Sequence, residues 1–375
     1  MLSFNLDDYE LVDVECGAYD GLALDTEGYS TYEQVLEAIR NLPPKPRKVS
    51  TRSLSVNGQV VHDRMDKYLA DPGESSSLMK KAMESPRAYY LDRTRALPEK
   101  EGRHFTFGTF AHSAILEPSL FAKVHVMPDA DRTSKEGCLA LLHYYGDLLG
   151  HCIPVDAGQR TIGELRKMIK ELEMTAAEEG HEFVKHSERQ IIDVLFGEFN
   201  TYGGGILPRL MQYAQTETSM YGEDPMTGLR VKIRPDGILL EENFGLNAVL
   251  SVKTTSAKNL RAFMADCAKY RYELAEGMYL EVASEITGRA FTATLMLVVQ
   301  SVEPYQIALI CWDAEDLAIG KAKYRKALDT VAKCREANRW PGFDAEAEDG
   351  TFGLLRAKLP QYIVNELKTN SDERP

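Results

Sequence analysis

The sequence predicts an α/β protein in which a central mixed β-sheet is flanked by helices. Apolar residues recur at helical spacing before position 200 and after position 314, whereas the region between them follows strand patterns. Within that region "LNAVLSVKTT" and "FTATLMLVVQ" are short and nearly continuously apolar, which is typical of strands covered on both faces. Helices at both ends, with one more between the strands, favour one sheet sandwiched by helices.

The first part of the chain predicts an extension followed by helices. Residues 1–63 contain "NLPPKPRK", and neither a helix nor a central strand runs through such prolines. We expect this segment to have little core of its own. Helices are expected at residues 74–93, 105–118 and 158–200. The serines that open "SSSLMKKAM" are suited to cap the first of these helices.

The middle of the chain predicts strands. "TETSMYGEDPMTGLRVKIRPDGILL" has two alternating segments around the turn "EDPMTG". Further strands are expected at residues 246–255, 291–300 and 305–312. A long helix is expected at residues 259–283, and a closing helix at residues 314–338. The resulting order is β-β-β-α-β-β with helices at both ends.

Composition limits the class of protein. The chain has 375 residues, of which 44% are hydrophobic, so it can bury a sizeable core. No run of eighteen apolar residues occurs, and the start "MLSFNLDDYELVDVE" is acidic, unlike a signal peptide. The six cysteines are scattered without a CxxC pair, which fits free thiols in a reducing compartment. We therefore expect a cytoplasmic protein without a membrane span.

The net charge of −13 argues against a protein that coats nucleic acid through bulk electrostatics. It still permits a local basic channel. Basic residues concentrate at residues 80–103 and again at residues 253–271. Either group supplies such a channel or lies on solvated helix faces.

An aspartate and a lysine on neighbouring strands carry the chemistry. Asp236 ends the strand pattern "KIRPDG", and Lys253 lies in "LSVKTT". Together they suit phosphodiester hydrolysis, because a carboxylate holds Mg²⁺ and the lysine polarises the attacking water or the phosphate. A strand-ending aspartate near a lysine also occurs by chance in many α/β proteins, so this pair alone is a weak signal.

Several further blocks strengthen the signal by their order. They are "SSSLMKKAMESPRAYY", "FGTFAHSAILEP", "TETSMYGEDPMTGLRVKIRPDG", "VLSVKTT", "YRYELAEGMYLE", "VEPYQIALICWD" and "RWPGF". In these blocks the chain resembles the PD-(D/E)xK nuclease superfamily, and within it the phage-type exonuclease VIII (RecE-like) group. The resemblance covers residues 64–345 and implies a restriction-endonuclease-like core, with residues 1–63 as an N-terminal extension and residues 346–375 as a C-terminal tail.

The resemblance implies a role for each matching residue. Asp236 matches the central metal ligand, and Lys253 the catalytic lysine. Glu217 in "TETSMYG" matches the acidic residue that completes the metal site, and His112 in "FAHSAILEP" matches the histidine of the group's active site. The backbone carbonyl of Val252 matches a further metal ligand.

Two positions depart from the family's pattern. The carboxylate expected two residues before the lysine is Ser251, and a glutamine of the following helix is Ala275. A serine hydroxyl replaces a charged ligand poorly, because Mg²⁺ prefers anionic oxygen. A subgroup of related restriction endonucleases reads SxK here and takes its glutamate from the following helix. At about 100° per residue, only Glu276 of that helix could serve; the alternative is a solvated acid on the helix rim.

The resemblance implies an exodeoxyribonuclease that depends on Mg²⁺, or on Mn²⁺, and degrades one strand from the ends of linear double-stranded DNA in phage or prophage recombination. It also implies a bacterial host cell, a homo-oligomer and a phage single-strand annealing protein as a partner. Ser251 and Ala275 keep a second interpretation open, a catalytically degenerate nuclease fold that serves as a DNA-binding or protein-interaction module, including an anti-defence one. The candidate DNA contacts are Arg87, Ser77, Lys258 and Arg271.

Overall fold

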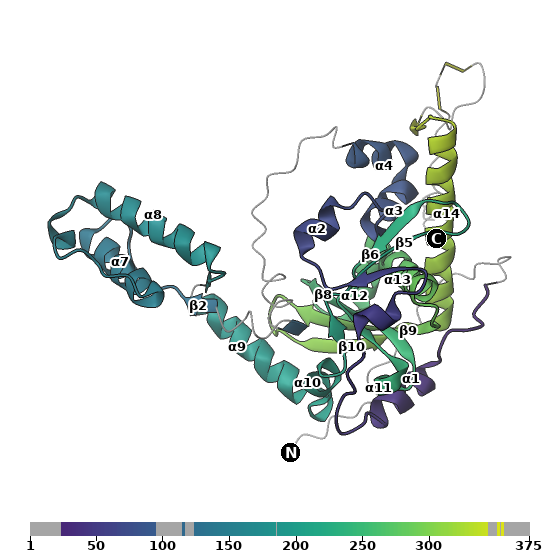
Figure 1. The fold of residues 1–375 in the computed structure, drawn as a ribbon, viewed down its shortest axis with the longest axis horizontal. Coiled ribbons are helices and arrows are strands. Elements are labelled where there is room, and N and C mark those ends of the chain that lie inside the picture. Colours follow the sequence, from purple (N-terminus) through teal and green to yellow (C-terminus); the bar gives the residue numbers. More distant parts are fainter. Residues whose placement is uncertain are drawn as a thin grey trace, which may run out of the picture.

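The structure is a computed structural model that describes residues 24–94, 115–116, 124–184, 186–343, 351–352 and 354–355. Its centre is a mixed sheet of five strands in the order β10-β9-β8-β7-β4 (Figure 1). The strands are β4 (Gln215–Thr216), β7 (Gly237–Leu239), β8 (Asn247–Thr255), β9 (Phe291–Gln300) and β10 (Ile307–Cys311). The pair β8 and β9 is parallel and the other pairs are antiparallel, which confirms the predicted mixed α/β class.

The alternation of β8 decides which side chains can share a site. Val249 belongs to the core beneath α12 (Leu260–Tyr270), α13 (Tyr272–Thr287) and α14 (Ala314–Glu336). Leu250 and Val252 belong to the cores on the other face. Because successive side chains of a strand point to opposite faces, Ser251 and Lys253 lie on the face that α13 covers.

The helix expected at residues 259–283 is two helices. Arg271 separates α12 from α13 with φ of 51°, a left-handed conformation in which its N–H bonds back to the carbonyls of Ala268 and Cys267. No glycine or proline marks this position, so the sequence pattern runs on without a visible break. The break lets α13 take its own direction across the sheet.

The helices α13 and α14 pack unusually closely. A Cβ atom added to Gly320 would lie 1.9 Å from the Glu273 carbonyl oxygen, and one added to Gly277 would lie 2.3 Å from the Lys321 nitrogen. Only glycine at these two crossing positions allows the backbones to approach so far. This contact fixes α13 against the long closing helix and so fixes the side chains that α13 turns toward β8.

The N-terminal segment is built into the body. The helix α1 (Tyr32–Arg40) starts with a capping box at Thr31 and buries Val35 and Ala38 in the same core as Leu250. The strand β1 (Gly58–Val61) pairs with β5 (Ser219–Glu223), which pairs with β6 (Arg230–Ile233) in a second, antiparallel sheet. The expected boundary between residues 63 and 64 therefore separates two segments that pack together. The edge strand β1 belongs to residues 1–63, and its partner β5 belongs to the domain expected at residues 64–345.

Three short helices complete the body around that second sheet. They are α2 (Met65–Ala70), α3 (Ser76–Glu84) and α4 (Pro86–Arg93). The side chain of Ser75 caps α3, as expected, and that of Ser85 caps α4. Trp340 of the "RWPGF" block stacks on Tyr89 and Tyr90 of α4. These contacts bring two blocks that are far apart in the sequence together in space.

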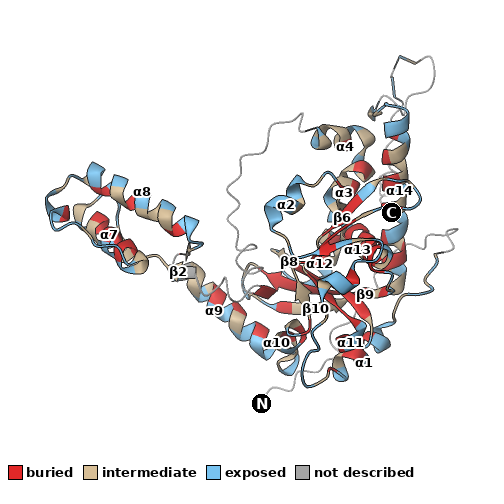
Figure 2. Ribbon diagram, viewed as in Figure 1, coloured by how far each residue is buried: buried red, intermediate tan, exposed pale blue. Residues whose placement is uncertain are grey.

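A helical hairpin extends away from the body (Figure 1). It consists of β2 (Val124–Val126), α7 (Lys135–Leu149), α8 (Ile162–Glu178) and β3 (Glu182–Val184). Its own small core includes Leu141, Tyr145 and Ile169, and Figure 2 shows buried residues along the facing sides of α7 and α8. The helices α9 (His186–Thr201) and α10 (Ile206–Met211) lead back to the sheet. No helix among the described residues is both long and apolar enough to cross a membrane.

Candidate active site

Asp236 and Lys253 meet at the centre of the main sheet. The pairing of β7 with β8 sets Gly237 opposite Leu250, which brings Asp236 to the next residues of β8. The backbone N–H of Val252 donates to Asp236 Oδ2, and the Lys253 Nζ lies 3.7 Å from the same oxygen. The Lys253 ammonium also donates to the Val252 carbonyl at 3.2 Å. It therefore stands between the two oxygens that were expected to hold a metal ion.

Neighbouring acidic groups stabilise the positive charge of Lys253. Burial opposes that charge, but attraction by Asp236, and then by Glu276, outweighs it and raises the pKa of the lysine above its ordinary value. Lys253 is therefore positively charged at neutral pH. A fixed ammonium at this place suits the stabilisation of negative charge on a phosphate.

Glu276 lies directly against Ser251. The Ser251 hydroxyl is 2.9 Å from both carboxylate oxygens of Glu276, and both residues have 0% exposure. The interpretation of Glu276 as a solvated acid on the helix rim is therefore wrong, because α13 is buried over this whole stretch. A carboxyl group of α13 thus lies beside Ser251.

Burial makes Glu276 an unusual acid. It raises the pKa of Glu276 to about 7, and the charge of Asp236 adds to the shift, while Lys253 and the Ser251 hydroxyl oppose it. Near neutral pH the side chain is therefore divided between its neutral and charged forms. A cation placed beside it would favour the charged form.

Glu217 lies at the margin of this group. Its N–H donates to the Asp236 carbonyl at 3.3 Å, and its backbone has φ of 53°. Its carboxylate is paired with Arg234, whose Nη2 lies 2.6 Å from Glu217 Oε2. Arg234 is only 8% exposed and also bonds Asp63 and Ser219. Arg234 lies within the motif "KIRPDG" but was assigned no role there, and its ion pair neutralises the charge that Glu217 was expected to offer.

His112 lies outside the described residues. The described part of its block is Ile115 and Leu116, which pack in the same core as Val252. These two residues thus pack against β8 on the face opposite Glu276.

The four candidate DNA contacts are spread over several elements. Ser77 is exposed on α3, and Arg87 is exposed on α4, where its guanidinium lies 6.0 Å from the Tyr90 ring. Lys258 is exposed between β8 and α12, and Arg271 is half-buried between α12 and α13. Lys80 belongs to the basic stretch at residues 80–103, and its ammonium and that of Lys253 both lie near the ring of Tyr272, a residue for which the sequence predicted no role.

The donor set fits a hard divalent ion in its chemistry. Asp236 and Glu276 offer carboxylate oxygens and Val252 offers a carbonyl, which are ligands that Mg²⁺ and Mn²⁺ prefer. Across the part of the chain that the structure describes, no three His, Cys, Asp or Glu side chains form a cluster arranged for a metal. An ion at this place would therefore depend on the carbonyl and on a movement of Glu276 away from Ser251.

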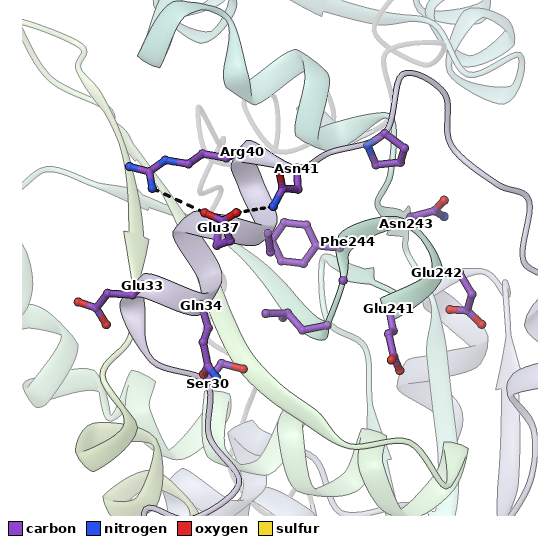
Figure 3. Close-up of a pocket in the computed structure, with 14 residues that line it drawn as sticks. Ser30, Glu33, Gln34, Glu37, Arg40, Asn41, Glu241, Glu242, Asn243 and Phe244 are labelled. Atoms are coloured by element: carbon purple, nitrogen blue, oxygen red, sulfur yellow. Dashed lines mark hydrogen bonds and ion pairs between the residues drawn. The ribbon is translucent and has the colours of Figure 1, made fainter.

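A separate pocket lies between α1 and α11 (Glu241–Phe244), as Figure 3 shows. Its side chains include the carboxylates of Glu33, Glu37, Glu241 and Glu242. None of the candidate catalytic residues lines it. A phosphate backbone would be repelled here, so this pocket is not part of the candidate site.

A comparison with family models decides the family. Residues 75–349, well over half of the chain, match the PDDEXK-like domain of unknown function (DUF3799). The chain belongs to this PDDEXK-like family. The match confirms the wider superfamily that the motif predicted, while the narrower exonuclease VIII group stays a prediction. The matched range of this PDDEXK-like chain includes Pro235, Asp236, Ser251 and Lys253.

Solved structures and curated proteins add little to this assignment. A candidate exonuclease from Eubacterium rectale shares 11% identity at a TM-score of 0.41, over 81% of this chain and 98% of that one. The protein SSO0001 shares 16% identity at a TM-score of 0.21, over 68% of this chain and 98% of that one. Neither similarity is close enough to carry an argument. No curated protein matches the chain.

Proposed function

We propose that this PDDEXK-like chain is a metal-dependent nuclease that hydrolyses DNA phosphodiesters. The observation that carries the proposal is the contact of Glu276 with Ser251, at 2.9 Å to each carboxylate oxygen. It puts an acid beside Asp236 and Lys253, where the sequence alone shows a serine. A degenerate site would have no physical need of a second buried carboxylate, whose burial is unfavourable.

The residues divide the work in a simple way. Asp236, Glu276 and the Val252 carbonyl would hold Mg²⁺ or Mn²⁺, and the bound ion would polarise the phosphate and make a water molecule more acidic. Lys253 holds its positive charge next to the phosphate and stabilises the negative charge that develops there. Arg234 orients Glu217 at the margin of the site through its ion pair.

The finer proposal is an exodeoxyribonuclease that acts on the ends of linear duplex DNA in phage-type recombination. It draws on the order of the sequence blocks named above. The test is an assay of the purified protein with Mg²⁺ and with Mn²⁺ on linear and on closed circular duplex. Cleavage of the linear form alone would support an exonuclease, and cleavage of both would favour an endonuclease.

The second candidate is a DNA-binding or protein-interaction module without hydrolysis. The ion pair of Glu217 with Arg234 favours it, because it withdraws one expected acidic group from the site. A protein that binds duplex DNA but cuts neither form with either ion would be this module.

Arg87 provides a separate test of DNA binding. We expect Arg87→Ala to weaken the binding of linear duplex and to lower the slope of log K against log salt by about one, because one phosphate contact is lost. Fluorescence anisotropy over a salt series measures both quantities. Arg160→Ala, in the hairpin that projects from the body, is the matched control and should change neither. If Arg87→Ala changes neither the affinity nor the slope, Arg87 does not contact DNA and is a solvated residue on the helix surface.

A further inference from the structure

One tyrosine ring beside the candidate site faces two ammonium groups. The Lys80 Nζ of α3 lies 4.8 Å from the centroid of the Tyr272 ring, and the Lys253 Nζ of β8 lies 5.9 Å from the same centroid. Tyr270 stacks on Tyr272 at 6.0 Å and Phe263 packs at 6.3 Å, so the ring is held in place. Elements far apart in the sequence thus bring two cations to one aromatic ring.

Lys80 differs from its neighbour in how its charge is balanced. Lys81, the next residue of α3, forms an ion pair with Glu84 at 3.2 Å and has a side chain that is 43% exposed. For Lys80, no carboxylate of the described residues lies within 4 Å of the ammonium, and the residue is half-buried. The Tyr272 ring and the more distant carboxylates of Glu276 and Glu273 attract this charge, without an ion pair to either carboxylate.

The surroundings of Lys80 disfavour its positive charge. Burial lowers the pKa of Lys80 to about 8, and repulsion by Lys253 adds to this shift, while Glu276 and Glu273 oppose it. Two neighbouring cations that repel each other gain most from an anion that reaches both. Glu273 is already paired with Lys323 at 2.7 Å, which leaves it poorly placed to be that anion.

We propose that Lys80 and Lys253 together form a binding site for a phosphate group of the DNA backbone, with Lys80 as the second cationic residue of the candidate active site. The inference rests on the proposed function, because it takes DNA as the ligand. A lysine binds phosphate as a point charge and needs no planar partner. The Tyr272 ring sets the position of both ammonium groups, so that a phosphate meets two charges already in place.

The test measures DNA binding without cleavage. The proteins are the wild type, Lys80→Met, which keeps most of the aliphatic stem, Lys80→Arg, which keeps the charge, and Lys81→Met as the matched control. Each is titrated into a fluorescent linear duplex in EDTA over a salt series, and its thermal unfolding is recorded. We expect Lys80→Met to bind about tenfold more weakly with a salt slope lower by about 0.9, as for one lost phosphate contact. Lys80→Arg should restore most of both quantities, and Lys81→Met should match the wild type.

The outcomes separate this inference from the proposed function. A folded Lys80→Met protein that binds with the wild-type affinity and slope would overturn the phosphate site, even if the wild type cuts DNA. A Lys80-dependent slope in a protein that cuts nothing with Mg²⁺ or Mn²⁺ would keep the phosphate site and overturn hydrolysis. A wild type that does not bind DNA at all would overturn both.

Discussion

Glu276→Gln should abolish the cleavage of linear duplex DNA, with a loss of roughly 100-fold or more in rate, because a hard ion loses one of its two anionic ligands. The glutamine keeps the size of the side chain and can still accept the hydrogen bond from Ser251, which the glutamate now accepts at 2.9 Å. Loss of activity would then reflect the lost charge rather than a cavity. The measurement is the rate of release of labelled nucleotides with Mg²⁺ and with Mn²⁺.

A second substitution turns this loss into a positive test. The double variant Ser251→Asp/Glu276→Gln should recover much of the cleavage, because β8 then supplies the carboxylate that α13 has lost, at the same contact. Ser251→Asp alone should not help, since it sets two carboxylates against each other in a buried place. Glu273→Gln, a buried acid of the same helix that pairs with Lys323, is the control and should keep cleavage. Full activity in Glu276→Gln would remove this glutamate from the site.

The same substitution should change how stability depends on pH. The pKa of Glu276 is raised from 4.5 to about 7 in the folded protein. An acid with a raised pKa gives its full contribution to stability below its unfolded pKa, and that contribution is lost as the pH rises through the folded value. The wild type should therefore lose stability between about pH 4.5 and pH 8, by on the order of 3 kcal/mol from this group.

Glu276→Gln carries no ionisable group at this position, so it should not show that loss. The difference in unfolding free energy between the variant and the wild type should grow in favour of the variant as the pH rises from 5 to 8. Urea unfolding at several pH values measures it. Glu285→Gln, exposed on the same helix, should show no such growth. A constant difference for Glu276→Gln across this range would mean that Glu276 is charged throughout and is better solvated than the structure indicates.

The central strands could be predicted from the sequence because their patterns are continuous. The expected strands at residues 246–255 and 291–300 correspond to β8 and β9, and "RPDG" correctly brought Asp236 beside β8. The helical repeat of about 100° per residue also singled out Glu276 as the acid of its helix that could reach the site. It did not give the burial of Glu276, because burial depends on how α13 packs against β8 and α14.

The features that escaped prediction depend on tertiary contacts. The break at Arg271 has no local signature, since a left-handed arginine is set by packing and not by residue type. The pairing of Glu217 with Arg234 joins the residue after β4 to the residue after β6, and the approach of Lys80 to Tyr272 joins α3 with α13. Such contacts form only when the elements are packed together. The candidate acids and the lysine could therefore be predicted from the sequence, but the charged groups that surround them could not.

A crystal structure of the protein soaked in Mn²⁺, with the ion located by its anomalous signal, tests the role of Glu276 most directly. We expect one ion in direct contact with carboxylate oxygens of both Asp236 and Glu276 and with the Val252 carbonyl, and a Glu276 side chain that has moved away from Ser251. An ion bound to Asp236 while Glu276 still accepts both contacts from Ser251, or no ion at this place at saturating Mn²⁺, would contradict the proposal that α13 supplies the missing carboxylate.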